Sequence, residues 1–377
     1  MPRTFDEIVS GWLGDGQIAV SSELAVEAFN RAERLLGKEW VESTRAGPGG
    51  ATISGTSPTL HVISIGQELA SLEGIANVDK LINSVRNGDS AARAELTAIS
   101  ILRDGDLSIQ VELYPRVSIG NRQREPDFRI RKPSDQWTYV EVTRPDISEV
   151  QQRLMEVMEK LLAPVVAISK SFALEVFFRR EPTDDELPTV IERITSICNT
   201  QGIVTEELPS GLGLLLLNHC NPMQIVPKDL PGEPNLIRLG QAKGIGGGVE
   251  PARHIAVRIP YADSRARQFL AKEARQLPKD APGLIVVNIV NAPGGIKSWE
   301  PLLQRALQPS VHTRIGGICL FMPCLILTDD GIASLLHTKF ISNPHARLPL
   351  PSWIPAAISS AGGEYERQMA KKIQKSG

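Results

Sequence analysis

The sequence has few residues that could cross-link a chain or hold a structural metal. Only four cysteines and six histidines occur in 377 residues. The cysteines lie in apolar surroundings and show no tight pairing pattern. This usage excludes a disulfide framework as the main source of stability, and we expect reduced, buried thiols.

Long apolar runs are missing as well. The longest, at 318–327, is interrupted by Pro323 and is too short to cross a bilayer. The first residues carry an acid early and contain no apolar stretch, so they predict no secretory signal. We therefore expect a cytoplasmic protein without a membrane partner.

Neither sign of charge dominates, and familiar catalytic motifs are absent. The chain has 41 Lys and Arg against 43 Asp and Glu, a net charge of −2. A site for a polyanion must therefore be a local basic patch.

The sequence contains no GxSxG or HExxH motif, and the glycine-rich segment 50–57 has Thr56 where a phosphate-binding loop needs lysine.

What the chain does contain is a regular alternation of helical and strand patterns. Hydrophobic residues make up 42% of it, which is enough for a sizeable core. Continuous apolar strands between helices predict an α/β fold with a largely parallel sheet. We divide the sequence into an N-terminal mixed helical region at 1–75, a core at 76–180, a C-terminal α/β extension at 181–358 and a polar tail at 359–377.

The central region has the clearest sequence of elements. Local patterns predict a helix at 90–102, strands at 107–117, 127–130 and 138–142, a helix at 148–168 and a strand at 173–178. Pro133, Ser134 and Asp135 predict the turn between the second and third strands. Elsewhere the apolar stretch 60–65 favours a strand, and the glycine-rich stretch 235–251 favours a loop.

Three acids stand out in this region. Glu95 lies in the helix, Asp127 follows Pro126, and Glu141 lies between two valines. Acids are depleted in strands and costly to bury without a partner. Carboxylates that a fold brings together are typical ligands of a hard divalent cation. Taken singly, each acid could instead be a solvated helix, turn or edge-strand residue.

The order of these elements, with Pro126-Asp127 and Glu141-Val142-Thr143 as the motif, resembles the PD-(D/E)XK nuclease superfamily over about residues 88–180. The resemblance implies a restriction-endonuclease-like core of helix, three-strand meander, helix and strand. It also implies metal-dependent cleavage of phosphodiesters, with DNA favoured as substrate. A role in restriction or phage defence is an analogy only.

The resemblance assigns roles to individual residues. Asp127, Glu141 and the Val142 carbonyl would hold Mg²⁺ or Mn²⁺, and Glu95 would orient a second metal or its water. Thr143 stands where the family has a lysine, and loss of one such electrostatic contact can lower a rate by about 10²–10³. The cations that could replace the lysine are Arg129, Arg144, Arg153 and Lys160.

A local basic segment supports a nucleic-acid partner. Between Arg116 and Lys132 there are six cationic side chains and two acidic ones. Such a segment beside an acidic site would neutralise phosphates, and a solvated loop is the alternative. The residues expected to contact nucleic acid are Arg122, Arg124, Arg129 and Arg131.

Two further functions stay open. Thr143 is compatible with a catalytically inactive nuclease-like module that binds nucleic acid or a protein partner. An unrelated α/β enzyme could use the C-terminal half, with Lys272 or the glycine-rich loop 244–248 at its site. A homodimer is also compatible with the sequence.

Overall fold

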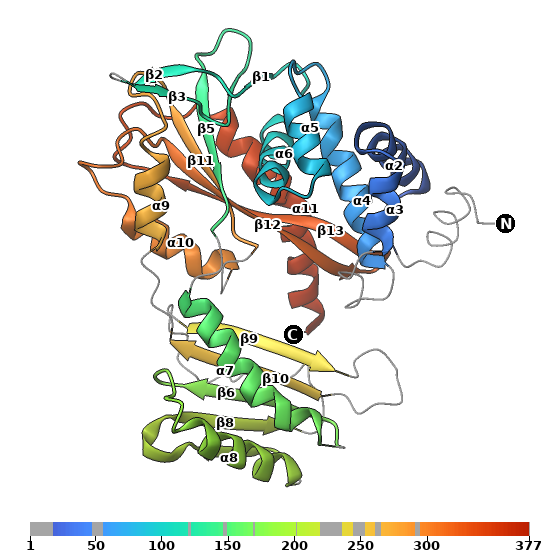
Figure 1. The fold of residues 1–377 in the computed structure, drawn as a ribbon, viewed down its shortest axis with the longest axis vertical. Coiled ribbons are helices and arrows are strands. Elements are labelled where there is room, and N and C mark those ends of the chain that lie inside the picture. Colours follow the sequence, from blue (N-terminus) through green and yellow to red (C-terminus); the bar gives the residue numbers. More distant parts are fainter. Residues whose placement is uncertain are drawn as a thin grey trace, which may run out of the picture. The chain divides into compact units, whose positions relative to one another are not determined.

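The structure is a computed structural model, and the chain divides into two compact units, which are described separately (Figure 1). Unit 1 contains Met1–Pro145, Arg265–Asn291 and Glu300–Gly377, and unit 2 contains Asp146–Ser264 and Ala292–Trp299. The residues that the structure describes are 18–46, 56–119, 122–145, 149–168, 170–200, 202–218, 236–243, 253–260, 265–290 and 295–376.

Unit 1 is built on a six-stranded mixed sheet. Within it β5, β11 and β12 are parallel, and the remaining neighbours pair antiparallel. The α/β class expected from the sequence is therefore confirmed, but the expectation of a largely parallel sheet is wrong, because three of the five strand pairings in this sheet are antiparallel. In spatial order the strands are β1 (Gln110–Leu113), β4 (Phe128–Arg131), β5 (Thr138–Thr143), β11 (Gly283–Asn288), β12 (Gly317–Thr328) and β13 (Gly331–Ser342). A separate two-stranded ribbon is formed by β2 (Val117–Ile119) and β3 (Arg122–Arg124).

Helices cover one face of this sheet, where the side chains of Phe128, Val140 and Val286 join the main core of unit 1. Residues of α5, α6 and α11 contribute to the same core. Glu141 follows Val140, so its side chain projects to the opposite face. The helices of this unit are α2 (Ser22–Leu36), α3 (Lys38–Ala46), α4 (Thr56–Leu69), η2 (Ala70–Leu72), α5 (Asp79–Arg86), α6 (Ser90–Arg103), α9 (Arg265–Glu273) and α11 (Trp353–Ser376), and the division between the units falls inside α10 (Gly295–Ala306).

Helix α6 is fixed at both ends by its own sequence. Asp89 caps the start, and its carboxylate accepts hydrogen bonds from the backbone N–H groups of Ala91 at 2.8 Å and Ala92 at 3.4 Å. The helix ends at Asp104, whose φ of 42° is left-handed, followed by Gly105. These caps satisfy backbone groups that a helix leaves open. They set the position of the helix that carries Glu95.

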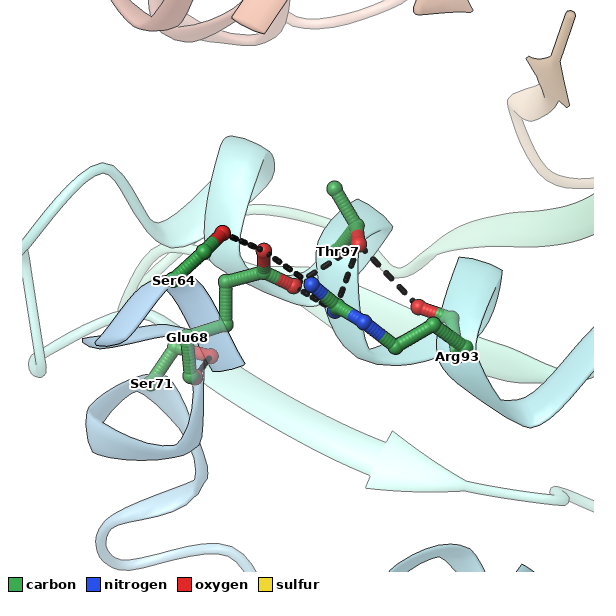
Figure 2. A network of polar contacts seen from close by, with 5 residues as sticks. All are labelled: Ser64, Glu68, Ser71, Arg93 and Thr97. Atoms are coloured by element: carbon green, nitrogen blue, oxygen red, sulfur yellow. Dashed lines mark hydrogen bonds and ion pairs between the residues drawn. The ribbon is translucent and has the colours of Figure 1, made fainter. Parts of the chain in front are cut away.

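A buried polar cluster joins α4 to α6 (Figure 2). The carboxylate of Glu68 accepts hydrogen bonds from the Arg93 guanidinium at 2.6 Å, from Thr97 Oγ1 at 2.7 Å and from Ser64 Oγ at 3.1 Å. Only 8% of the Glu68 side chain is exposed. A buried carboxylate needs such partners, so the cluster fixes how α6 lies against α4.

The hairpin between β4 and β5 contains the turn expected from the sequence. Ser134 has a φ of 77°, and the Asp135 N–H donates to the Lys132 carbonyl at 3.0 Å. The Asp135 carboxylate accepts a hydrogen bond from Trp353 Nε1 at 2.9 Å. The turn is therefore tied to α11, far away in the sequence.

Unit 2 is a five-stranded sheet with α7 and α8 packed into one common core against it (Figure 1). β6 and β10 pair parallel, and the other neighbours pair antiparallel. Its elements are α7 (Glu149–Val166), β6 (Phe172–Phe178), α8 (Leu187–Asn199), β7 (Val204–Glu207), η3 (Pro209–Gly211), β8 (Gly213–Asn218), β9 (Leu236–Lys243) and β10 (Arg253–Pro260).

The structure differs from several expectations. The boundary expected at residue 180 lies at Pro145, because α7 and β6 pack within unit 2. The expected strand at 60–65 belongs to helix α4. The described part of the expected loop at 235–251 is strand β9, and residues 235 and 244–251 lie outside the described chain. The expected polar tail is the end of α11, whose first turns are buried against unit 1.

The cysteines are free wherever the structure describes them. Cys198 and Cys319 are buried, Cys324 is half-buried, and Cys220 lies outside the described residues. Burial raises the pKa of the Cys198 thiol to about 12, as expected for a thiol in apolar surroundings. None of the described helices combines the length and the apolar character that a membrane span requires.

Candidate active site

Asp127 directly precedes β4 and faces Glu141 of the neighbouring strand β5. Phe128 pairs with Val140, and one further step in this register places Asp127 opposite Glu141. The Asp127 carboxylate accepts a hydrogen bond from the Val142 N–H at 2.6 Å. Asp127 is thereby fixed where β4 meets β5.

The environment of Glu141 disfavours an ionised carboxylate. Only 1% of it is exposed. One carboxylate oxygen, Oε2, accepts a weak hydrogen bond from Gln276 Nε2 at 3.4 Å, and Oε1 has no hydrogen-bond partner among the described residues. Burial, followed by the negative charges of Asp127 and Glu273, raises the pKa of Glu141 to about 10. The metal-free protein therefore favours a protonated Glu141 at neutral pH.

Glu95 approaches the same acids from α6. Its Oε2 accepts a hydrogen bond from Tyr114 Oη at 2.9 Å. Lys80 Nζ lies 3.7 Å from the centre of the Tyr114 ring. Burial, followed by the charge of Asp127, raises the pKa of Glu95 to about 7. The three acids singled out in the sequence thus act on one another electrostatically.

The pKa of Asp127 is shifted in the same direction. Burial raises it to about 6, and the charge of Glu273 adds to the increase. The Val142 N–H and the cations Lys80 and Lys272 oppose the increase. Perturbed acids that influence one another are typical of functional sites, although structural charge networks also produce them.

A fourth acid, Glu273, and its neighbour Lys272 are additions that the sequence interpretation did not place at this site. Glu273 ends α9, is 4% exposed and raises the pKa of both Asp127 and Glu141. Lys272 Nζ lies 3.4 Å from Glu273 Oε1, and its charge lowers the pKa of the same two acids. The sequence feature that could have revealed Glu273 is its place on the apolar face of a helix. Glu273 lies three residues after buried Leu270 and four before buried Leu277.

The donor set fits a divalent cation. Asp127 raises the pKa of Glu95 and Glu141, and Glu273 raises the pKa of Asp127 and Glu141. A cation among these carboxylates would relieve the repulsion. The buried Oε1 of Glu141 offers an acceptor without a donor in the described chain. As the side chains stand, no three described His, Cys, Asp or Glu residues are gathered closely enough to surround a metal. Three of the acids instead accept hydrogen bonds from protein donors.

Three of the four cations expected to replace the missing lysine are engaged elsewhere, and the fourth, Arg144, is half-buried directly after β5. Arg129 is paired with Glu112 and donates to Tyr139. In unit 2, Arg153 is paired with Glu181, and Lys160 with Asp184. Thr143 itself is half-buried at the end of β5, opposite Val287 of β11. The cations that influence the acids are Lys272 and Lys80.

The basic segment is divided between two structures. Arg122 and Arg124 belong to the β2–β3 ribbon, and the Arg122 side chain lies outside the described part. Arg129 and Arg131 project from β4, and their guanidinium carbons lie 4.5 Å and 4.3 Å from the centre of the Trp137 ring. Such contacts resemble cation–π pairs. Whether the four arginines contact nucleic acid stays a prediction.

Lys272, which was considered for an unrelated site in the C-terminal half, lies beside the predicted acids instead. The loop 244–248 considered with it falls outside the described residues. Comparison with known proteins found no family model, curated protein or solved structure that matches the chain.

Proposed function

We propose that this chain is a metal-dependent nuclease that hydrolyses phosphodiester bonds, with DNA as the favoured substrate. The observation that carries the proposal is the group formed by buried Glu141 with half-buried Asp127 and Glu95. The charge of Asp127 raises the pKa of the other two acids, and Glu141 Oε1 has no hydrogen-bond partner among the described residues. Acid groups of this kind are expensive to bury. A hard cation held by these acids would offset the cost of burying them and would act on a phosphodiester substrate.

The order of elements around the acids supports a restriction-endonuclease-like core. In unit 1 the chain runs from α6 through β1, the β2–β3 ribbon, β4 and β5 to α9 and β11. Apart from the ribbon, this is the order helix, three strands, helix, strand. Most of unit 2 is inserted between β5 and α9. The helix and the last strand of the proposed core are therefore α9 and β11, whereas the sequence resemblance used 148–168 and 173–178.

The residues of the chain divide the proposed work among them. Asp127, Glu141 and the Val142 carbonyl would hold Mg²⁺, or Mn²⁺ in its place, and Glu95 would orient the water. The bound metal supplies an activated water and charge stabilisation at the scissile phosphate. Tyr114 fixes the Glu95 carboxylate by its hydrogen bond.

Lys272 is the best candidate for the charge that Thr143 cannot supply. Its ammonium group lowers the pKa of both Asp127 and Glu141, so its field reaches the place where negative charge would develop. A preorganised cation at such a place stabilises the transition state. The exposed position of Lys272 leaves it accessible to a phosphate.

Cleavage of end-labelled DNA and RNA, with and without Mg²⁺ or Mn²⁺, tests the proposal. We expect metal-dependent cleavage that falls by a factor of about 10²–10³ or more in Asp127→Asn and Glu141→Gln. The matched control is Glu33→Gln, which changes an exposed acid of α2. Equal cleavage in EDTA, or full activity of the Asp127→Asn protein, would contradict the proposal.

The second candidate is a nuclease-like module that binds nucleic acid, or a protein partner, without cutting. Thr143 favours it, because the family's lysine is replaced. The same assay separates the two functions. DNA binding without metal-dependent cleavage, in wild-type protein and in Thr143→Lys alike, would support the non-catalytic module.

A further inference from the structure

Unit 1 has a second polar site, which shares no residue with the acid cluster. It is a pocket of about 650 Å³. Its walls come from the segments before β11, between α10 and β12, and between β13 and α11. The lining residues are Lys279, Ser310, Val311, Thr313, Arg314 and Arg347.

The charge of this pocket is of one sign. Three of its lining residues, Lys279, Arg314 and Arg347, are cationic, and none is acidic. In the part of the chain that the structure describes, no carboxylate forms an ion pair with these three cations. Ser310 and Thr313 add hydroxyl groups that can donate hydrogen bonds. Cations that line one pocket without a carboxylate partner are suited to an anion.

The pocket is held by hydrogen bonds to backbone carbonyl groups, and these bonds do not depend on a ligand. Arg314 Nη1 donates to the Leu277 carbonyl at 3.1 Å, and the Arg347 N–H donates to the Thr313 carbonyl at 2.8 Å. Asn343 is 4% exposed. Its Nδ2 donates to the carbonyl groups of His312 and Ile315, the two residues that flank Thr313 and Arg314. The cationic groups are therefore attached to a preformed frame.

We propose that this pocket binds a phosphate group carried by a nucleotide or a nucleic-acid strand. Arginine and lysine are the usual partners of phosphate, and arginine can bind it through two parallel hydrogen bonds. The volume falls within the range of small-molecule pockets, so it leaves room for the organic part of the ligand. Val311, which is 51% exposed, offers an apolar contact for that part.

The pocket lies near the proposed active site along the chain. Gln276 contacts Glu141, Leu277 accepts the hydrogen bond from Arg314, and Lys279 lines the pocket. Three residues of chain span at most about 11 Å. A nucleic-acid strand with its scissile phosphate at the acids would therefore place a neighbouring phosphate within reach of the pocket. This identification of the ligand as a nucleic-acid strand rests on the proposed function.

Calorimetric titration of full-length Asp127→Asn protein without divalent metal tests the phosphate site apart from cleavage. The probes are adenosine monophosphate, adenosine, and a single-stranded oligonucleotide. We expect the monophosphate to bind and adenosine not to bind. Lys279→Gln and Arg347→Gln should each weaken binding about tenfold or more, whereas Arg34→Gln, a change in an exposed arginine of α2, should not.

The oligonucleotide arm distinguishes the two sources of phosphate. Tighter binding of the oligonucleotide, displaced by the monophosphate and weakened by the same two substitutions, supports a strand as the ligand. Oligonucleotide binding that these substitutions leave unchanged supports a free nucleotide. Equal binding of adenosine and its monophosphate, unchanged affinity in both variants, or no saturable binding of any probe would overturn the phosphate site. None of these outcomes depends on metal-dependent cleavage, so the two proposals can fail separately.

Discussion

At the scale of single residues, Glu141 is where the chain departs most from ordinary protein chemistry. Its burial and the charges of Asp127 and Glu273 all oppose ionisation. An unperturbed glutamate in the unfolded chain has a pKa of about 4.3. The folded protein therefore holds a proton at Glu141 over a pH range in which the unfolded chain has lost it. The stability of the metal-free protein must fall as pH rises through that range.

This sign gives a prediction for Glu141→Gln. At pH 8 the substitution removes the cost of keeping Glu141 protonated in the folded state, so the free energy of unfolding of the metal-free protein should increase by about 1 kcal/mol or more. Wild-type protein should lose stability between pH 5 and pH 8, and the variant should lose less. Urea denaturation in EDTA at both pH values measures this. A wild-type stability that rises over this interval, or a variant less stable than wild type at pH 8, would show that the acids are stabilising as ions.

A second prediction concerns the charge that replaces the missing lysine. If Lys272 supplies it, Lys272→Gln should lower the rate of metal-dependent cleavage by about 10²–10³. Thr143→Lys should add little to the wild-type rate but should restore much of the rate lost in Lys272→Gln. Single-turnover cleavage measures both effects. The control is Lys371→Gln, which changes an exposed lysine near the end of α11. A Lys272→Gln protein with the wild-type rate would remove Lys272 from the mechanism.

The sequence identifies some of these residues and hides others for physical reasons. Asp127 and Glu141 are visible because an acid inside a strand pattern is costly and therefore conspicuous. Glu273 and Lys272 look like ordinary charges of an amphipathic helix. Their contact with the acids depends on a chain return after the insertion of unit 2, and local periodicity carries no information about that return.

At the scale of elements, the position of α6 depends on the cluster shown in Figure 2. Removal of Arg93 would leave Glu68 buried without its main partner. We expect Arg93→Ala to lower the free energy of unfolding by about 3 kcal/mol. Urea denaturation measures the loss, with Arg34→Ala as an exposed control. A change within about 0.5 kcal/mol, as for an ordinary surface substitution, would show that the cluster does not hold α4 to α6.

Sequence patterns predict the elements around the acids well and fail where packing overrides local preference. The β-branched residues at 60–65 favour a strand, yet they lie in α4, where Val62 and Ile63 pack with residues of α2. Gly66 permits this approach, because a Cβ there would lie 1.9 Å from the Ala28 carbonyl oxygen. Gly362 similarly brings α11 against β13, where a Cβ would lie 2.4 Å from Thr338 Oγ1. In each case a glycine allows the helix to pack closely against its neighbouring element, and this packing outweighs local sequence preference.

At the scale of the whole molecule, the α/β class follows from the alternation of patterns, whereas the division into units does not. Helix α7 and strand β6 follow β5 directly in the sequence, as the next elements of one sheet would. They instead begin an inserted unit with its own core. A strand followed by a helix and a strand has the same local pattern whether it continues one sheet or starts another.

A metal bound at the acid cluster would join elements from three separate parts of the chain, α6, the β4–β5 hairpin and α9. The most direct measurement is titration of the protein with Mn²⁺ by calorimetry at pH 7 in two buffers of different ionisation enthalpy. We predict saturable binding with release of protons, since the raised pKa values mean that carboxylates must lose protons to bind the metal. Asp127→Asn and Glu141→Gln should abolish it, and Glu33→Gln should not. Absence of saturable binding in wild-type protein, or equal binding by the three variants, would contradict the account.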